Sequence, residues 1–201
     1  MPERPRTVLR VGWQPLAYNL PYYVSIRDSL FESNGFEVKT MKFDNSNAMA
    51  EALAVGSIDL ATSVSTQALL AVESNRPGLI KILYVHISSA AKPGDFLLTK
   101  KDSQINNTLL LEGHNIGYHT GSTMLLYAKA VLIDSLGFKN VNLIPIPPEH
   151  QRAALLNGTV DALFAYDPIA TQLIQEDSAR ILISAPKNWI MQNMPSGCYG
   201  L

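Results

Sequence analysis

The segment Thr120-Gly121-Ser122-Thr123 has the residue types and the position of an anion-binding turn. It lies between a predicted strand, 116–119, and a helix predicted to start at Ser122. Backbone N–H groups at the start of a helix attract a negative or strongly polar group, and two hydroxyl side chains would lie beside them. The pattern therefore predicts either a ligand site or a plain helix cap at Ser122. It excludes a P-loop, because no Gly-Lys-Ser/Thr follows.

Further polar and aromatic residues follow predicted strands, the places where open α/β sheets bind ligands. Trp13, Gln14 and Tyr18 come after the first predicted strand, 8–12. Trp13 would form a flat wall of a site or pack in the core, and Gln14 would offer a directed amide. His119 directly precedes the turn described above, so it either touches the same ligand or is a buried structural histidine.

Three serines and one aromatic–acidic pair occupy similar positions. Ser63 and Ser65 follow the third predicted strand, and Ser88 follows the fourth. Each could bind a ligand or serve only as a turn or cap residue. Tyr166-Asp167-Pro168 ends a strand of the second half. Its phenol and carboxylate could hydrogen-bond a ligand, although an aspartate before a proline could equally cap the next helix.

The residues that would support catalysis or metal binding do not form a recognisable pattern. The histidines are scattered without metal-ligand spacing, and no Gly-x-Ser-x-Gly nucleophile turn occurs. Cys198 is the only cysteine, which excludes an internal disulfide and a multi-cysteine metal cluster. We therefore expect no catalytic residues, no metal and no cofactor, and binding without catalysis. The four histidines are His86, His114, His119 and His150.

The elements that must position these residues are encoded twice. Residues 52–60, ALAVGSIDL, and residues 154–162, ALLNGTVDA, each read as a helix end, a glycine turn and a buried strand. Asp59 and Asp161 would lie at the strand entrances, where a structural role is expected. Two copies of one unit predict two similar lobes that close on something small.

Strands alternate with helices along both halves, which predicts an α/β fold with mostly parallel sheets and right-handed crossovers. The predicted strands are 8–12, 37–43, 58–62, 80–87, 96–100, 116–119, 141–146, 160–165 and 179–184, with 80–87 buried. The predicted helices are 21–30, 46–55, 65–73, 122–136, 149–156 and 168–175.

Composition narrows the class of protein. The chain has 201 residues, of which 47% are hydrophobic and 16% charged. This composition predicts a globular protein with enough hydrophobic residues to form a core. The net charge of −1 gives no electrostatic reason to expect nucleic acid as a partner. No apolar run is long enough to span a bilayer. Residues 1–6, MPERPR, lead into no apolar segment, so no export signal is expected in this sequence.

The order of motifs resembles a known family, the solute-binding components of ABC importers for nitrate, taurine, aliphatic sulfonates and thiamine pyrimidine precursors. The likeness covers nearly the whole chain. The motifs that carry it are Val11-Gly12-Trp13-Gln14, Phe43-Asp44, the two repeated phrases, Ile116-Gly117 with Gly121-Ser122, and Asp167-Pro168.

The resemblance implies a type II periplasmic-binding-protein fold, in which two lobes joined by crossing strands close around a solute. It places a first lobe at 1–95, a hinge strand at 96–101, a second lobe at 102–195 and the start of a return strand at 196–201. The ligand residues implied by the resemblance, together with those expected from position, are Trp13, Gln14, Tyr18, Ser63, Ser65, Ser88, His119, Gly121, Ser122, Thr123, Tyr166 and Asp167.

The chain departs from the family pattern in three places. An Asp-Leu-Lys-Gly-Lys-like segment is replaced by residues 110–115, LLEGHN, and the aromatic residue before Asp167 is Tyr166 where tryptophan is common. The C-terminal helices that pack on the first lobe in the family are missing. The sequence is either shortened or a reduced form of the family, and if it is shortened, the first lobe is expected to expose apolar surface.

The resemblance implies a non-enzymatic, monomeric receptor outside the cytoplasm that captures a small polar, anionic solute and delivers it to a membrane permease. An enzyme of thiamine-pyrimidine or menaquinone biosynthesis built on the same fold is the alternative. The cysteine-rich signature of the pyrimidine synthase is absent, which disfavours that enzyme. A ligand-sensing domain is a third possibility.

Overall fold

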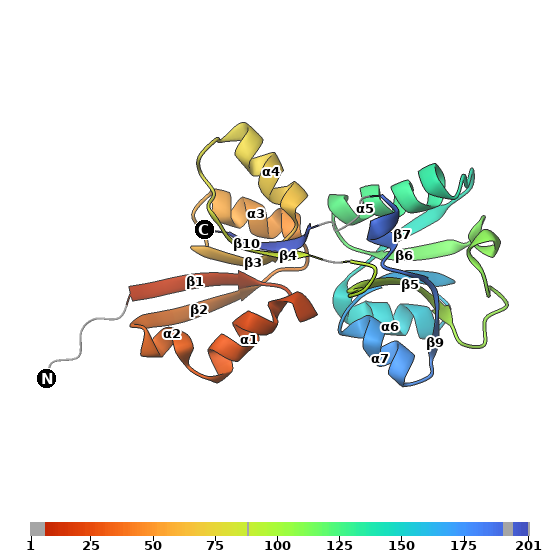
Figure 1. Cartoon of the computed structure of the whole chain (residues 1–201), viewed down its shortest axis with the longest axis horizontal. Coiled ribbons are helices and arrows are strands. Elements are labelled where there is room, and N and C mark those ends of the chain that lie inside the picture. The colour runs from red at the N-terminus through yellow and green to blue at the C-terminus, as the bar shows by residue number, and fades with distance from the viewer. Residues whose placement is uncertain (1–6, 88, 191–194, 201) are drawn as a thin grey trace, which may run out of the picture. The chain divides into compact units, whose positions relative to one another are not determined.

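The computed structural model describes residues 7–87, 89–190 and 195–200, shown as the coloured ribbon in Figure 1. The chain folds into two compact units. The first unit takes in residues 1–86 and 195–201, and the second takes in residues 87–194.

The first unit contains a five-stranded sheet in the order β2-β1-β3-β10-β4. β1 pairs in parallel with β2 and β3, whereas β10 runs antiparallel to β3. The strands are β1 (Thr7–Trp13), β2 (Phe36–Lys42), β3 (Leu60–Val64), β4 (Ile82–Ile87) and β10 (Pro195–Gly200). The helices are α1 (Leu20–Arg27), α2 (Leu30–Ser33), α3 (Ser46–Ala54) and α4 (Thr66–Asn75), with a short 3-10 turn at Ala17–Asn19.

The second unit contains a sheet of the same design, in the order β7-β6-β8-β5-β9. β6 is parallel to β7 and β8, and β5 runs antiparallel to β8 and β9. The strands are β5 (Asp95–Lys100), β6 (Asn115–His119), β7 (Asn142–Ile146), β8 (Ala162–Tyr166) and β9 (Ala179–Ser184). The helices are α5 (Ser122–Lys129), continued by a π-helical segment at Ala130–Ser135, α6 (Pro148–Leu156) and α7 (Ile169–Gln175), with 3-10 turns at Thr108–Leu111 and Pro186–Trp189.

The expected α/β fold with mostly parallel sheets is confirmed, and the two segments expected to connect the lobes overlap strands of the two sheets. The segment expected as a hinge, 96–101, largely coincides with β5, which pairs on both sides inside the second sheet. The segment expected as a return strand, 196–201, overlaps β10, which lies between β3 and β4 in the first sheet. The boundary between the units accordingly falls between His86 and Ile87, earlier than the expected position at residue 95.

The repeated phrase forms the same local structure in both units. Gly56 and Gly158 adopt positive φ angles of 72° and 79°, which an L-residue with a side chain rarely takes. The Asp59 carboxylate accepts the backbone N–H of Arg10 at 2.8 Å, and the Asp161 carboxylate accepts that of Asn115 at 2.9 Å. Each aspartate thus ties the residue before its own strand to the neighbouring parallel strand, which is the expected structural role.

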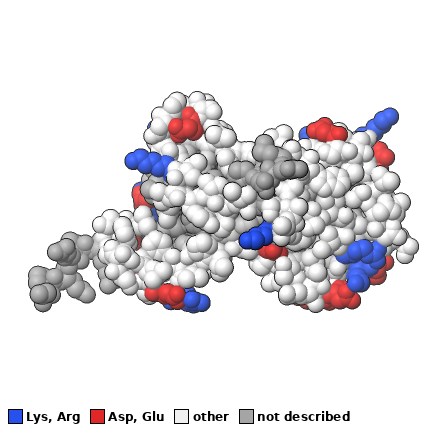
Figure 2. All heavy atoms as spheres, viewed as in Figure 1, with Lys and Arg blue, Asp and Glu red and all other residues white. Residues whose placement is uncertain are grey.

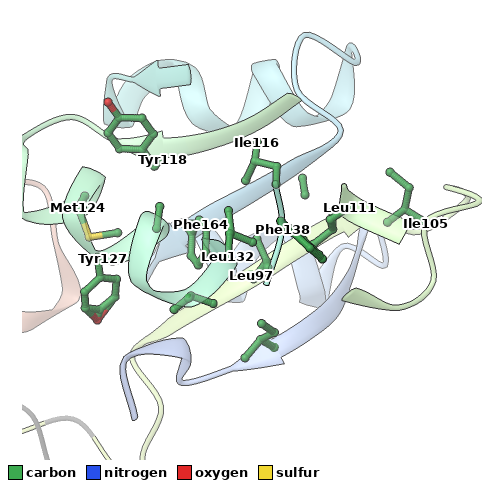
Figure 3. Packing of buried hydrophobic residues seen from close by; sticks show 14 residues of the cluster. Leu97, Ile105, Leu111, Ile116, Tyr118, Met124, Tyr127, Leu132, Phe138 and Phe164 are labelled. Atoms are coloured by element: carbon green, nitrogen blue, oxygen red, sulfur yellow. The ribbon is translucent and has the colours of Figure 1, made fainter. Parts of the chain in front are cut away.

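The second sheet is buried on both faces because its strands alternate between two hydrophobic clusters. Leu97 and Phe164 belong to the cluster shown in Figure 3, together with residues of α5 and the π-helical segment. Their neighbours in sequence, Leu98 and Leu163, point to the opposite face and pack with residues of α6 and α7. Each such buried side chain contributes roughly 1.5–3 kcal/mol, so the two clusters are the main stabilisation of this unit.

Two predictions about the first unit are wrong. Segment 80–87 was expected to be a buried strand, but β4 exposes most of its side chains, with Leu83 59% and Tyr84 52% exposed. Hydrophobicity predicted the strand but could not show whether another element covers it. The helix expected over 21–30 is also interrupted, because Ser29 takes a left-handed φ of 51° and separates α1 from α2.

Charged side chains lie in small mixed groups on the face shown in Figure 2, where the described residues form no extended basic surface. Within the described parts of the chain, no helix is long and apolar enough to cross a membrane.

Candidate functional site

Each unit carries a cluster of polar residues at the carboxyl ends of its parallel strands. In the first unit this is the Gln14 cluster, which surrounds the side chain that follows β1. Gln14 is only 1% exposed, and its Nε2 lies 3.2 Å from Ser46 Oγ and 3.4 Å from the Ser63 carbonyl oxygen. The cluster consists of Gln14, Asn19, Ser46, Ser63 and Ser65.

The backbone of Gln14 is fixed as firmly as its side chain. Its carbonyl oxygen accepts hydrogen bonds from the Asn19 Nδ2 group and, at 3.1 Å, from the Tyr23 hydroxyl. Asn19 is fully buried. A buried amide held from both sides cannot reorient, so the cluster is preorganised and has a small entropic cost of binding. Asn19 and Ser46 were not predicted as members of the site.

The two predicted serines after β3 have different roles. Ser65 caps α4, because its Oγ accepts the Ala68 N–H at 3.3 Å, and its own N–H donates to Ser46 Oγ at 3.0 Å. Ser63 is 3% exposed and has a positive φ of 53°. Its Oγ has no hydrogen-bond partner among the described residues. Ser63 is therefore the stronger candidate for contacting a ligand.

The structure favours packing roles for the aromatic residues of this loop. Trp13 stacks on Tyr22 at 6.2 Å between ring centroids and meets Tyr23 edge-on at 6.0 Å, within a hydrophobic cluster. Tyr18 packs against His86 of β4, at 5.6 Å between ring centroids. Ser88, which was also predicted to bind a ligand, lies outside the described residues.

In the second unit, the turn before α5 has the predicted strand–turn–helix form. Gly121, with a φ of 123°, occupies the N-cap position, and Ser122 is the first helical residue. The alternative that Ser122 itself is the cap is therefore wrong. Gly121 has no side chain to cap the helix, so the ligand reading of Ser122 and Thr123 stays a prediction.

The Tyr166-Asp167 pair divides between two roles. The Asp167 carboxylate accepts the Thr171 N–H at 3.0 Å and the Thr171 hydroxyl at 2.6 Å, so it is committed to the start of α7. The Tyr166 hydroxyl donates to Met124 Sδ at 2.6 Å, and its ring meets His119 edge-on at 5.8 Å. Tyr166 and His119 thus belong to one polar and aromatic group, the Lys187 cluster, which consists of His119, Tyr127, Gln151, Tyr166 and Lys187.

His119 is held neutral by its surroundings. It is 5% exposed, and burial lowers the pKa of its imidazole to about 4, with the nearby Lys187 charge acting in the same direction and Glu149 opposing it. Its Nδ1 lies 3.4 Å from Gln151 Nε2, which also donates to the Ile146 carbonyl oxygen at 3.2 Å. A neutral imidazole at pH 7 donates one hydrogen bond from its protonated nitrogen and accepts one at the other.

Lys187 was not predicted from the sequence. It lies in the 3-10 turn that follows β9, is 5% exposed, and places Nζ 4.3 Å from the ring centroid of Tyr166 and 5.5 Å from that of Tyr127. Burial lowers the pKa of this ammonium to about 8, partly offset by Asp95. β9 runs in the same direction as β8, because both are antiparallel to β5. The rule that ligand residues follow parallel strands, applied to β9, would have found Lys187.

Both clusters offer hydrogen-bonding groups, and the Lys187 cluster also carries a positive charge. Among the described residues, no group of three or more His, Cys, Asp or Glu side chains is arranged to hold a metal ion. Buried amides, hydroxyls and an ammonium suit the recognition of a small polar or anionic molecule.

Comparison with known proteins agrees with the observed fold. The chain is 27% identical over 177 residues to an Escherichia coli strain K12 protein whose name describes it as binding aliphatic sulfonates. The match covers 87% of this chain and 54% of that protein, so the chain spans about half the length of this relative.

Two solved structures share the fold. The alkanesulfonate-binding protein SsuA from Xanthomonas axonopodis pv. citri, bound to MOPS, matches with a TM-score of 0.75 and 22% identity, over 98% of this chain and 66% of that one. The periplasmic nitrate-binding protein NrtA from Synechocystis PCC 6803 matches with a TM-score of 0.68 and 15% identity, over 98% of this chain and 55% of that one.

The model of one protein family, described as the NMT1-like family, matches residues 3–196 of the 201 in this sequence. Because this match takes in both compact units and both polar clusters, the chain belongs to the NMT1-like family.

Proposed function

We propose that the chain is the solute-binding part of an ABC importer and captures a small anionic solute, with organosulfonates as the first candidates. The observation that carries the proposal is the pair of buried polar clusters at the carboxyl ends of parallel strands, one in each unit. The clusters supply hydrogen-bond donors, and the second adds the Lys187 ammonium. We propose that these groups contact the solute.

The choice of solute class is supported by the relatives. The sequence relative and the SsuA structure are both named for sulfonates, and the NrtA structure is named for nitrate. Sulfonate and nitrate share a compact, permanently charged group of oxygen acceptors, which buried N–H and O–H donors can satisfy.

The partner and the compartment follow from the same role. A solute receptor delivers its cargo to a permease in the membrane, and the nitrate-binding relative is named as periplasmic. We therefore place this chain outside the cytoplasm and propose that it binds solute as a monomer. We also propose binding rather than catalysis. In support, the pKa of His119 lies near 4, which leaves this side chain neutral and poorly suited to exchange protons at pH 7.

The test is a thermal-shift screen followed by titration calorimetry with ethanesulfonate, taurine, nitrate and bicarbonate. The buffer must be Tris, since common buffers such as MOPS are themselves sulfonates. A solute at 100 times its Kd stabilises the native state by about 2.7 kcal/mol, which raises Tm by roughly 5–10 °C in a chain of this size. A folded protein whose Tm responds to none of the four anions would contradict the proposal.

A matched pair of variants tests the turn before α5. Ser122 is exposed at the start of that helix, and Ser135 is exposed at the end of the π-helical segment that continues it. S122L should weaken binding of the best anion by about tenfold or more, because a bulky apolar side chain would block the helix start. S135L should bind as the unchanged protein does. Equal affinity of S122L and the unchanged protein would remove this turn from the site.

A further inference from the structure

Lys187 is a buried cation whose ammonium has no carboxylate within ion-pair distance among the described residues. Its ammonium lies over the rings of Tyr166 and Tyr127, and no ion pair of Lys187 occurs among the described residues. The Asp95 carboxylate, whose charge acts on the Lys187 ammonium, accepts the backbone N–H of Lys187 at 3.3 Å. Asp95 is thus bound to the main chain of this turn, and its charge only partly offsets the effect of burial on the ammonium.

Stability alone does not explain this arrangement. An ammonium removed from water loses its hydration, and two aromatic faces replace only part of it. The lowered pKa of Lys187 is the sign of that uncompensated cost. A methionine of similar length would fill the same space between the two rings without the cost. The positive charge therefore points to a role beyond packing.

Titratable groups near Lys187 come from several elements, and the π-helical segment that packs against its turn carries the exposed Asp134. Asp95 lies on β5, Tyr127 on α5, and Tyr166 at the end of β8. His119, at the end of β6, is kept neutral partly by the charge of Lys187. Glu149 on α6 acts on His119 in the opposite direction. Besides the Asp95 and Glu149 carboxylates, an anion arriving here would meet one ammonium, two tyrosines and a neutral imidazole.

We propose that Lys187 supplies the counter-charge for the anionic group of the solute, an oxyanion such as a sulfonate that enters beside Tyr166. This inference rests on the proposed function and adds the residue that selects for negative charge. The Tyr166 and Tyr127 rings position the ammonium and exclude water from it, which strengthens its attraction for an anion. Neutral molecules of the same shape would leave the ammonium unpaired and bind poorly.

The proposal predicts that binding depends on pH. A bound anion favours the protonated form of Lys187, so affinity is highest where the free protein already carries the charge. Above the pKa of Lys187, near 8, its side chain is a neutral amine, which must take up a proton before it can pair with the anion. Affinity should then fall by up to about tenfold for each pH unit.

The experiment measures the Kd of ethanesulfonate by calorimetry at about pH 7 and about pH 9.5, because the sulfonate itself does not titrate in this range. The unchanged protein should bind about tenfold or more weakly at the higher pH. K187M should bind at least tenfold more weakly at the lower pH and show no pH dependence. K129M, which changes an exposed lysine of the same unit, should behave like the unchanged protein.

K187R is the second variant and keeps the charge across the whole pH range. It should retain most of the affinity while losing the pH dependence, an outcome that a purely structural role of Lys187 would not produce. If K187M does not fold, K187R and the pH dependence of the unchanged protein decide the question. A flat affinity from about pH 7 to about pH 9.5, or unchanged binding by folded K187M, would overturn the inference. Failure of the unchanged protein to bind any of the four anions would instead contradict the proposed function.

Discussion

His119 makes the stability of the protein depend on pH in the acidic range. The pKa of this buried imidazole is about 4 in the folded chain, against an ordinary value near 6.5. Between these two values the unfolded chain binds more protons than the folded one, so stability falls as the pH drops from 6.5 towards 4. The loss from this one group is at most about 3 kcal/mol. Urea unfolding at a series of pH values should show it.

The matched variants are H119Q and H150Q. H119Q removes the buried group that titrates, so its stability should change less between pH 6.5 and 4 than that of the unchanged protein. His150 is exposed on α6, and H150Q should keep the full acid dependence. An H119Q protein with the same acid dependence as the unchanged chain would contradict this assignment.

The residues of the two clusters could be found from the sequence only where they directly follow a strand. Gln14 and Ser63 were predicted in that way, and His119 was predicted because it ends a strand directly before the turn that precedes α5. Asn19 and Gln151 were missed because they approach from helical segments, and only the fold shows which helical side chains turn inward. The prediction for Asp167 left two roles open, and its hydrogen bonds to Thr171 tie its carboxylate to the first turn of α7. The sequence Asp-Pro is the same whether the aspartate contacts a ligand or holds the start of a helix, so the sequence alone could not separate the two roles.

The element β4 presents an apolar sheet edge. It is the last strand in the order of the first sheet, its sequence ILYVHI has no Asp, Glu, Lys, Arg or proline, and Leu83 and Tyr84 line a hollow of about 220 Å³ with Pro21 and Leu60. Exposed edges of this kind favour pairing between chains. At concentrations above those at which it binds solute as a monomer, the 201-residue chain should therefore associate, which sedimentation velocity would detect.

Lysines on β4 should suppress that association. Leu83 and Val85 point to the same face of the strand, and both are exposed, so the double variant L83K/V85K should fold and remain monomeric at higher concentration. L126K places the same charge on an equally exposed leucine of α5 and should leave the association unchanged. Association of L83K/V85K as strong as that of the unchanged chain would show that β4 is not the contact.

Most helices and strands were predictable because their formation depends on local sequence patterns. The repeated Gly-x-x-Asp phrase predicted β3 and β8, and alternation with helices predicted parallel pairing. The place of β5 was not predictable in the same way. Its sequence DFLLTK is apolar enough for any buried strand, and its position between β8 and β9 depends on partners 60 or more residues later in the chain. Long-range pairing of this kind has no local signal.

At the scale of the whole molecule, the two sheets differ in where their antiparallel strand comes from. In the second unit this strand is β5, which directly precedes the rest of that sheet in the chain. In the first unit it is β10, which follows the entire second unit and inserts between β3 and β4. The second sheet is therefore built from one continuous segment, whereas the first needs residues from both ends of the sequence.

The two units should consequently differ in whether they fold alone. A fragment of residues 87–190 contains all five strands of its sheet and both hydrophobic clusters. It should melt cooperatively, with an unfolding enthalpy of about 60–80 kcal/mol by calorimetry, as expected for a domain near this size. A fragment of residues 1–86 lacks the strand between β3 and β4, so it should show no cooperative transition. Joining residues 195–201 to it through a flexible linker should restore one. Cooperative melting of the 1–86 fragment alone, or no cooperative melting of the 87–190 fragment, would mean that the insertion of β10 between β3 and β4 does not decide which unit folds alone.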